Sequence, residues 1–378
     1  MGDHHEEAMQ LALELAEDGF GRVAPNPLVG AVLIRDGRIV GTGCHQAFGG
    51  PHAEINAIAA AGEKARGATL YVTLEPCKHQ GKTPPCTEAI IKAGVARVVY
   101  GARDRHPPAS GGVEVLTAAG IPVEGPVLEE RCLEINAPFF KHVATGKPLV
   151  LAKWAMTLDG KLASTLGESR WISSEASRKL VHQWRGRAGA VLVGVGTALA
   201  DNPVLTCRVP ELPNPWRVVL DAGCRTPRDS RLFEPDPEKP GPARVLIYAS
   251  EKAPAERAGA LRDAGAEVAT MPDNSGKVSL NAVLDDLGRR GVNLVLVEGG
   301  SEVLGSFFDA GLIDQVLVFI APKLVGGRAA KPALGGEGLP KMLDAAILRE
   351  LKNYRLEGDV VVEGKIGSWE WAEAPKKA

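Results

Sequence analysis

The chain shows no sign of a disulfide framework, a membrane helix or a secretion signal. Six cysteines among 378 residues are too few for a secreted fold held together by disulfides. No apolar run approaches the roughly 18 residues that a membrane-spanning helix needs. The first seven residues are acidic and lack the basic-then-apolar order of a signal peptide. We therefore expect a cytoplasmic protein with no membrane partner.

A strong charge of either sign is also missing. The formal net charge is −2, whereas a nucleic-acid-binding domain usually carries a marked basic excess. Apolar residues make up 45% of the chain, which is too many for a disordered protein. We expect a globular protein whose partners are small molecules and not nucleic acids.

The length predicts two domains, because 378 residues exceed what one hydrophobic core usually organises. A basic stretch broken by Pro and Gly, at 140–148, marks the expected boundary and gives domains 1–147 and 148–378. In both halves helical and strand patterns alternate, which predicts an α/β fold with mostly parallel, helix-covered sheets. The first half is predicted to hold helices at 6–18, 53–61 and 87–93, a hairpin at 29–43, and strands at 68–74 and 96–100.

The second half continues the same alternation. It is predicted to hold strands at 149–156, 190–195, 216–220, 244–248, 292–297 and 315–320, helices at 174–187, 253–264, 279–290 and 302–310, and a surface loop at 227–242.

His52, Cys77 and Cys86 supply one imidazole and two thiols, three ligands of the kind that zinc prefers. Cys86 stands where a helix begins, and the positive end of the helix dipole favours a thiolate there. Glu54 is two residues from His52 on the same predicted helix, so it points about 200° away and is free to bond a water at the metal. His-x-Glu followed by Pro-Cys is typical of zinc-dependent nucleobase deaminases.

This arrangement fits hydrolytic deamination. Zinc makes water a nucleophile near neutral pH. Glu54 can take the proton of that water and pass it to the ring nitrogen of the nucleobase and to the departing ammonia. A structural zinc site would instead need a fourth protein ligand, for which His79 and Cys44 are the candidates. The sequence leaves this alternative open.

Three motifs together resemble the bifunctional deaminase–reductase family of riboflavin biosynthesis. They are Pro25-Asn26-Pro27-Leu28-Val29-Gly30, Pro51-His52-Ala53-Glu54, and the Glu75-Pro76-Cys77 to Thr83-Pro84-Pro85-Cys86 segment. Eight residues separate the two cysteines, unlike the short spacing of cytidine and transfer-RNA adenosine deaminases. The resemblance spans nearly the whole chain.

The resemblance implies a cytidine-deaminase-like three-layer α/β/α domain. Its substrate would be 2,5-diamino-6-(5-phosphoribosylamino)pyrimidin-4(3H)-one, which loses its 2-amino group. Asn26, His45, His79 and Lys82 would contact that substrate, and a lysine in a Gly-containing loop suits its phosphate. Asn26 could also simply shape a turn, and His45 and Lys82 could be ordinary surface residues.

In the second half, two glycine-containing turns are candidate phosphate sites. Gly194-Val195-Gly196 follows a strand, but Leu199 replaces the third glycine of a dinucleotide fingerprint and Asp201-Asn202-Pro203 interrupts any following helix. The turn after residue 297 is the better candidate, because its glycines let backbone N–H groups approach an anion at a helix start. An ordinary strand-to-helix turn remains the alternative.

The resemblance continues through Lys153 to Lys161, Ser169 to Ser173, Val195 to Arg208 and the Glu298-Gly299-Gly300 turn. It implies a dihydrofolate-reductase-like α/β domain that uses NADPH to reduce the ribosyl group of the deaminated product to ribityl. The NADPH contacts would be Ala155, Trp171, Thr197, Asp201, Gly300, Ser301, Glu302, Val303, Leu304, Gly305 and Ser306. The substrate contacts would be Ser169, Arg185, Leu205, Arg208 and Glu298.

Proton transfer during reduction needs an ionisable group, and Lys153 and Asp201 are the candidates. Lys153 could instead be a strand lysine that reaches solvent, Asp201 a turn-capping carboxylate, and Trp171 a core aromatic. Nothing in the sequence excludes a homo-oligomer, and we count self-association among the possible partnerships of this protein.

Two other readings of the whole chain stay open at this point. The first is a nucleoside or transfer-RNA deaminase with an unrelated accessory domain. The second is a nucleotide-sensing protein with a structural zinc. The long cysteine spacing argues against the first, and Glu54 beside an open zinc position argues against the second.

Overall fold

The computed structural model describes residues 2–81, 84–239, 241–274, 276–367 and 369. The chain divides into two compact units, the first ending at Gly146 and the second running from Lys147 to Trp369. Each unit has its own sheet and its own hydrophobic core. Within the described ranges, every helix is too short or too polar to span a bilayer.

The first unit is built on a five-stranded sheet of order β2-β1-β3-β4-β5. Its strands are β1 (Gly30–Arg35), β2 (Arg38–Cys44), β3 (Thr69–Leu74), β4 (Arg97–Ala102) and β5 (Val123–Glu124). Strand β1 pairs antiparallel with both β2 and β3, whereas β3, β4 and β5 are parallel. The expectation of a mostly parallel sheet is therefore wrong for this unit, because the hairpin β1–β2 supplies its two antiparallel pairings.

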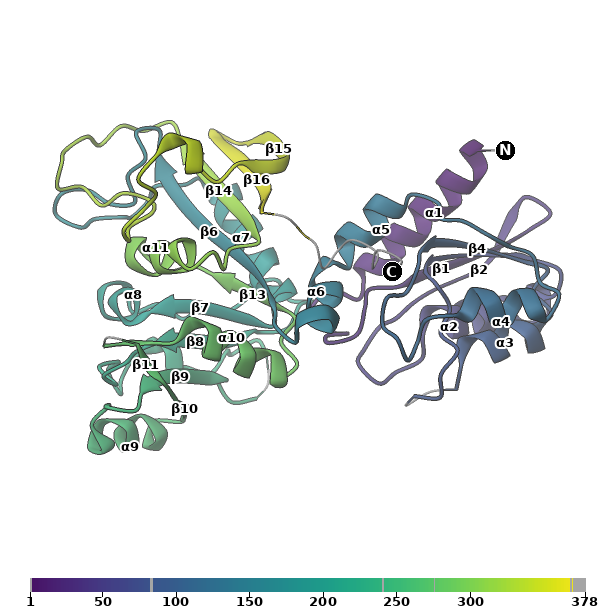
Figure 1. The fold of residues 1–378 in the computed structure, drawn as a ribbon, viewed down its shortest axis with the longest axis horizontal. Helices are drawn as coiled ribbons and strands as arrows, with labels where there is room; N and C mark the ends of the chain where they lie inside the picture. The colour runs from purple at the N-terminus through teal and green to yellow at the C-terminus, as the bar shows by residue number, and fades with distance from the viewer. Residues whose placement is uncertain (1, 82–83, 240, 275, 368, 370–378) are drawn as a thin grey trace. The chain divides into compact units, whose positions relative to one another are not determined.

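Helices cover both faces of this sheet and make three layers. They are α1 (Gly2–Glu17), α2 (Ala53–Ala61), α3 (Cys86–Ala93), α4 (Gly112–Ala118), α5 (Glu129–Ile135) and α6 (Ala137–Thr145). Helices α1 and α5 lie on one side, and α2, α3 and α4 lie on the other (Figure 1). The three-layer prediction is confirmed.

Helix α2 sits unusually close to strand β2, and glycine makes this possible. A Cβ added at Gly43 would lie 2.4 Å from the backbone nitrogen of Ala57, and one at Gly41 would lie 2.4 Å from the Ala57 carbonyl oxygen. On the helix side the contact is made by small residues, Ala53, Ala57 and Ala61, all buried. This close packing fixes the start of α2, where His52 and Glu54 stand.

The second unit is built on a nine-stranded sheet of order β10-β9-β8-β7-β13-β6-β14-β16-β15. Its strands are β6 (Leu149–Thr157), β7 (Ala190–Gly194), β8 (Trp216–Leu220), β9 (Val245–Ser250), β10 (Ala266–Met271), β13 (Leu294–Val297), β14 (Gln315–Ala321), β15 (Leu348–Leu356) and β16 (Asp359–Ile366). All pairings from β10 to β14 are parallel, and β16 then pairs antiparallel with both β14 and β15. The prediction of a mostly parallel sheet is therefore confirmed for this unit, in which the hairpin β15–β16 at the edge supplies the antiparallel pairings.

Two short 3-10 helices, Arg231–Phe233 and Met342–Asp344, lie in loops of the second unit, and its other elements connect these strands. They are α7 (Glu175–Arg187), α8 (Val195–Asp201), α9 (Ala255–Asp263), α10 (Leu280–Arg289), α11 (Ser301–Asp309) and a small hairpin, β11 (Asp273–Asn274) with β12 (Lys277–Val278). Parallel strands end at a common edge of the sheet, where ligands of open α/β folds bind. Figure 1 shows α8 and α11 close to the strands that they follow.

Helices α6 and α8 are among those that the sequence did not predict. Helix α6 runs through Thr145 into the stretch where the domain boundary was placed, and it buries Phe139 and Phe140. A helix, α8, does follow Gly194, and it ends where Asn202 takes a left-handed conformation ahead of Pro203.

Candidate active sites in the two units

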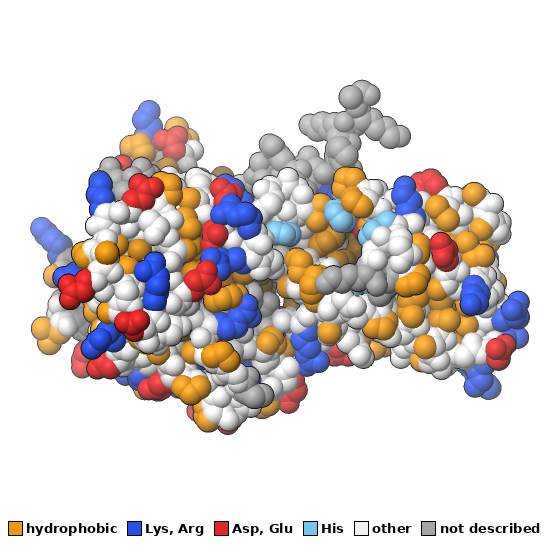
Figure 2. Space-filling view, turned by 90° about the horizontal axis from the view of Figure 1, so that it is seen from below, with side chains coloured by type: hydrophobic (Ala, Val, Ile, Leu, Met, Phe, Trp, Pro, Cys, Tyr) orange, Lys and Arg blue, Asp and Glu red, His pale blue; other side chains and the backbone are white. Residues whose placement is uncertain are grey.

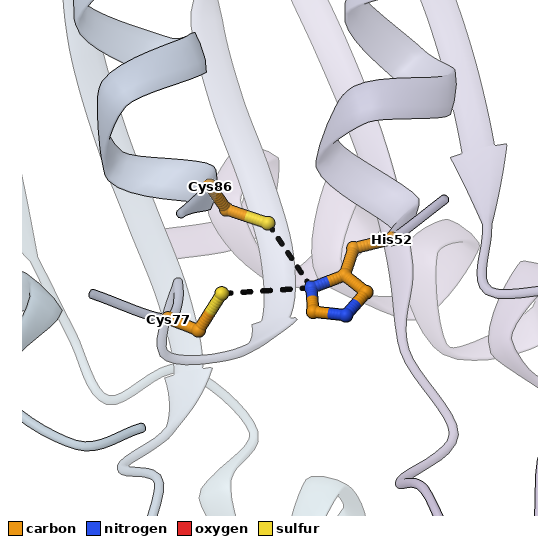
Figure 3. Close-up of side chains that lie close together, drawn as sticks. All are labelled: His52, Cys77 and Cys86. Carbon is orange, nitrogen blue, oxygen red and sulfur yellow. Dashed lines mark hydrogen bonds between the residues drawn. The ribbon is translucent and has the colours of Figure 1, made fainter. Parts of the chain in front are cut away.

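His52, Cys77 and Cys86 meet at one point of the first unit. The His52 Nδ1 atom lies 3.2 Å from the Cys86 sulfur and 3.5 Å from the Cys77 sulfur. The three ligand atoms lie within 4.8 Å of one another. Figure 3 shows the imidazole nitrogen pointing between the two sulfurs. One nitrogen and two sulfurs in this arrangement fit a tetrahedral zinc ion with one position left for water.

Three separate elements deliver these ligands. His52 is the N-cap of α2 and Cys86 is the first residue of α3, while Cys77 lies in the loop after β3. Among the described residues, the cluster includes neither His79 nor Cys44, so neither closes the site as a fourth ligand. The arrangement therefore favours an open, catalytic site over a closed, structural one.

The two thiols have very different acidities. A hydrogen bond from Cys86 lowers the pKa of Cys77 to about 4, and the same contact raises the pKa of Cys86. The hydrogen bond with Cys77 also raises the pKa of His52. Of the two thiols, Cys77 is therefore the one that favours the thiolate form before a cation binds.

Glu54 is buried in the first turn of α2 and lies outside the ligand cluster. Its side chain is only 3% exposed. Burial raises its pKa to about 7, with a further contribution from the Cys77 charge. A carboxyl group with that pKa can both accept and return a proton near neutral pH.

A cavity of about 380 Å³ opens beside the cluster and is lined by Asn26, His45 and His79 together with His52 and Glu54. The Pro51 carbonyl can only accept, so His45 Nδ1 donates to it over 2.9 Å. His45 Nε2 must then accept from the Asn26 amide nitrogen at 3.1 Å. Burial lowers the pKa of His45 and keeps it neutral in this role. The Asn26 carbonyl oxygen is left to accept a hydrogen bond from a ligand.

Of the four residues predicted to contact the deaminase substrate, three line this cavity, and Lys82 lies outside the described residues. The structure adds Asp104, His106, Phe139 and His142, which the sequence reading missed. Asp104 and His106 follow β4, the parallel neighbour of the strand before Cys77, so their position at the shared sheet edge was a usable signal. Figure 2 shows histidine side chains close together among hydrophobic ones on the displayed face.

Glu75 fixes the loops around this cavity. It is 3% exposed, and its carboxylate accepts from the backbone nitrogens of Asp104, Gly111 and Val113 at 3.2, 3.0 and 3.0 Å. Arg103 also donates to it, at 3.1 Å. Glu75 thereby ties the Cys77 loop to the segment that carries Asp104.

In the second unit, Lys153, Arg185 and Glu298 form a buried ionic cluster. Arg185 donates to both Glu298 oxygens, at 2.7 and 2.9 Å, and Lys153 Nζ lies 3.5 Å from the same carboxylate. Burial alone would raise the pKa of Glu298, but Arg185 and Lys153 outweigh it and lower that pKa to about 2. Burial lowers the pKa of Lys153. Two cations around one anion leave a net positive charge, which suits an anionic substrate.

This geometry rules out one alternative for Lys153. Its side chain is 17% exposed and its ammonium faces Glu298, so it is not a strand lysine reaching into solvent. Ala155 is two residues further along β6 and so lies on the same face of the strand. Glu298 directly follows β13, whose Val297 pairs with Ala152 of β6. The sheet register therefore brings Lys153 and Glu298 together.

Ser169, Leu205 and Arg208 remain predictions as substrate contacts. Leu205 is buried at a backbone φ of +58°, a left-handed conformation. The next residue, Thr206, accepts hydrogen bonds at its carbonyl oxygen from Arg185 at 3.2 Å and from His182 Nδ1 at 3.1 Å. The segment that carries Leu205 is thus attached to the ionic cluster.

The candidate cofactor cradle lies between α8 and α11. Gly300 donates its N–H to Thr197 Oγ1 at 3.2 Å, and Gly300 caps α11 without a capping side chain. Helix amide groups left open in this way fit a pyrophosphate. Ser301, Leu304 and Gly305 are buried, so the predicted cofactor contacts of this turn that stay at least partly exposed are Gly300, Glu302, Val303 and Ser306.

Trp171 and Asp201 were both predicted to contact NADPH. Trp171 is 64% exposed, so it is not a core aromatic, and the Arg178 guanidinium stacks 4.4 Å from its ring centre. Asp201 is the last residue of α8, and its carbonyl oxygen accepts from Arg170 at 2.9 Å. Contact of either residue with the cofactor stays a prediction.

Comparison with known proteins agrees with both sites. The family described as the cytidine and deoxycytidylate deaminase zinc-binding region matches residues 3–102, and the RibD C-terminal domain family matches residues 148–362. The riboflavin biosynthesis proteins RibD of Aquifex aeolicus and Actinobacillus pleuropneumoniae are 42% and 41% identical to the chain. The aligned region covers 94% of this chain in both cases, and 96% and 93% of those proteins.

Comparison with solved structures also finds riboflavin biosynthesis proteins. The Thermotoga maritima diaminohydroxyphosphoribosylaminopyrimidine deaminase/5-amino-6-(5-phosphoribosylamino)uracil reductase superposes with a TM-score of 0.82 at 39% identity. The superposition covers 97% of this chain and 99% of the Thermotoga maritima chain. Acinetobacter baumannii RibD superposes with a TM-score of 0.84 at 34% identity, covering 97% and 100%.

The fold and the sites define a zinc-dependent nucleobase deaminase joined to a reductase of dihydrofolate-reductase-like fold. The chain belongs to the RibD family of riboflavin biosynthesis proteins. The expected fold class, the two enzymatic activities and the zinc and NADPH requirements are confirmed. The alternatives of an unrelated accessory domain and of a nucleotide sensor are set aside.

Proposed function

We propose that the first unit removes the 2-amino group of 2,5-diamino-6-(5-phosphoribosylamino)pyrimidin-4(3H)-one. The observation that carries this proposal is the convergence of His52, Cys77 and Cys86 beside the buried Glu54, at the wall of a cavity. A zinc ion held there supplies the acidity that lets water act as a nucleophile at neutral pH. Glu54 takes the proton of the attacking water and passes it to the ring nitrogen and then to the departing ammonia.

Asn26 and His45 orient the pyrimidine in this proposal. The hydrogen-bonded chain from Pro51 through His45 to Asn26 fixes which way the Asn26 amide points. Its carbonyl oxygen then accepts from an amino group of the ring. His79 lies at the same cavity wall, and Lys82 is assigned to the phosphate by resemblance alone.

We propose that the second unit reduces the ribosyl group of the deaminated product to ribityl. NADPH supplies the hydride when bound. Lys153, Arg185 and Glu298 present a net positive charge at the carboxyl end of β13, and this charge holds the phosphorylated substrate. Lys153 is our candidate for the group that delivers a proton to the opened sugar.

A single pair of assays tests both halves. Ammonia release and NADPH consumption are followed on the diaminopyrimidine substrate, with and without a zinc chelator. We expect the chelator to stop ammonia release while NADPH is still consumed when the deaminated pyrimidine is supplied directly. Ammonia release that continues without zinc would contradict the proposal for the first unit.

We further propose that the chain acts in the cytoplasm and self-associates through the β15 edge. Every interior residue of β15 is exposed, although unpaired strand edges are usually covered. Met342, Leu343 and Ile347, just before it, are 89%, 95% and 78% exposed. Light scattering should find an oligomer in the wild type and a smaller species in a Leu343→Glu, Ile347→Glu variant; equal masses would contradict it.

A further inference from the structure

His182 lies on α7 beside Arg185 and contacts the segment that carries the predicted substrate residues Leu205 and Arg208. The two α7 side chains share a face of the helix, because residues three apart are neighbours on its surface. Both donate to one acceptor, the Thr206 carbonyl oxygen. The distance is 3.1 Å from His182 Nδ1 and 3.2 Å from Arg185 Nη1. A carbonyl oxygen has two lone pairs and can accept both bonds.

The segment 205–209 is held in place through its main chain. Leu205 takes a backbone φ of +58°, a left-handed conformation that costs energy for a residue with a side chain, so surrounding contacts must maintain it. The Cys207 sulfur donates to the His182 carbonyl oxygen at 3.1 Å, and the Cys207 carbonyl oxygen accepts from Lys239 at 2.6 Å. Thr206 is the residue through which this segment is bonded to the ionic cluster.

Arg185 uses all three of its nitrogens within the protein. Nε and Nη2 donate to the Glu298 carboxylate at 2.7 and 2.9 Å, and Nη1 donates to Thr206. A substrate phosphate that draws Nη1 towards itself would take this donor away from the Thr206 carbonyl. Thr206 is only 7% exposed, and leaving a buried carbonyl without a donor is costly. His182 prevents that loss, because its own bond to the same oxygen remains.

His182 makes this bond without adding a charge to the site. Burial, together with the positive charges of Arg185 and Arg208, lowers the pKa of His182 to about 4. Because the Thr206 carbonyl can only accept, the proton of the neutral imidazole is on Nδ1. A lysine or arginine at this position would instead place a further cation beside two others and repel them. A neutral imidazole therefore suits a donor that holds the main chain and leaves the anion to the arginines.

We infer that His182 is a positioning residue of the reductase, which keeps the Thr206 carbonyl bonded while Arg185 turns Nη1 to the phosphorylated substrate. The inference rests on the proposed reductase function. By holding Thr206, His182 also keeps the exposed Arg208, two residues further on, in place for the same substrate. His182 moves no proton in this role. The free protein does not depend on His182 for this bond, because Arg185 also donates to Thr206 there, so the defect of a variant should appear on substrate binding.

Three variants of the full-length protein test this. His182→Leu removes the donor, His182→Asn keeps an N–H close to the place of Nδ1, and Gln183→Leu, at the next and exposed position of α7, is the matched control. Calorimetry gives the Kd of the deaminated pyrimidine for protein saturated with NADP⁺, and steady-state kinetics give kcat and KM. We expect His182→Leu to raise Kd and KM about tenfold, the loss of one hydrogen bond, with kcat and the urea midpoint near the wild type. His182→Asn should restore most of the affinity, and Gln183→Leu should change none of these quantities.

Four results would overturn the inference. They are an unchanged Kd in His182→Leu, an equal loss of affinity in His182→Leu and His182→Asn, a large drop of the urea midpoint in both variants, and a fall in kcat that removes one limb of its pH profile. The last result would make His182 a proton donor, and the third would make its role purely structural. A wild type that binds the deaminated pyrimidine but never oxidises NADPH with it would contradict the proposed function, and the Kd values of the variants would still test the role of His182.

Discussion

At the scale of single residues, two buried carboxyl groups have opposite acidities. Burial raises the pKa of Glu54 to about 7, whereas the burial of Glu298 is outweighed by Arg185 and Lys153, which lower its pKa to about 2.

Only a few types of side chain bind zinc, so His52, Cys77 and Cys86 could be predicted as its ligands from residue type and spacing alone. Residue type alone did not identify Asp104 or His142, because a lone carboxylate or imidazole has many ordinary roles, and only the position of Asp104 after the parallel strand β4 pointed to it. The ion-pair partners of Glu298 could not be predicted from the sequence either, because they come from β6 and α7, which are far away along the chain.

Glu298→Gln should destabilise the second unit. In the wild type its pKa is about 2, below the ordinary value of 4.5, so the stabilisation is present above pH 4.5 and is lost as the pH falls towards 2. The substitution leaves two buried cations with no anion, and should cost about 3 kcal/mol at pH 7.

Urea unfolding followed by tryptophan fluorescence measures this effect. All six tryptophans lie at position 154 or beyond, so the signal comes from the second half of the chain. The difference between variant and wild type should shrink between pH 5 and pH 3. A difference that is constant across that range would show that Glu298 is not the titrating group.

Asn26→Ala should lower kcat/KM of deamination about tenfold, because it removes one hydrogen bond worth about 1.5 kcal/mol. His45→Ala should have a similar effect, since His45 acts by orienting Asn26. The double variant should then be little worse than either single one. Zinc content and NADPH oxidation serve as controls and should not change; fully additive losses would contradict the coupled role.

At the scale of elements, long periodic helices and buried strands were predicted within a few residues of their observed ends. Several of the elements that were missed are short or atypical, although β16, with eight residues, is neither. Helices α4, α5 and α8 have seven residues each, too few to show a helical period. Strand β15 is exposed along its interior, so it has no alternation of apolar and polar residues to detect.

Gly43→Ala tests whether close packing of α2 on β2 holds the zinc ligands in place. The added methyl would overlap the backbone of Ala53 and Ala57, at 2.5 and 2.4 Å, and should cost about 1–3 kcal/mol. Because α2 begins at the metal site, the variant should lose zinc to a chelator faster than the wild type.

Ile39→Ala, on the same strand but 54% exposed, is the matched control for this experiment. It should lose zinc at the wild-type rate. If Gly43→Ala also kept zinc at the wild-type rate, α2 would not depend on this packing.

At the scale of the whole molecule, two α/β domains followed from length and from the repeated alternation of strands and helices. The hairpin at 29–43 was predicted, but the antiparallel pairing of its first strand with β3 was not, because the sequence does not show which strands pair across a helical connection. The boundary at 147 and 148 predicts that each half folds alone. Residues 1–147 should release ammonia in a zinc-dependent way, and residues 148–378 should oxidise NADPH with the deaminated substrate. Loss of both activities on separation would show that the domains depend on each other.

The central claim is that Glu54 carries the proton in a zinc-dependent deamination, and Glu54→Gln tests it most directly. The measurement is the rate of ammonia release from the diaminopyrimidine, alongside zinc content and NADPH oxidation of the same preparation. Because a positioned general acid–base contributes about 10²–10⁴-fold, ammonia release should fall by at least about a hundredfold while the other two readings stay at the wild-type level. A variant that keeps its zinc and still releases ammonia at the wild-type rate would contradict the account.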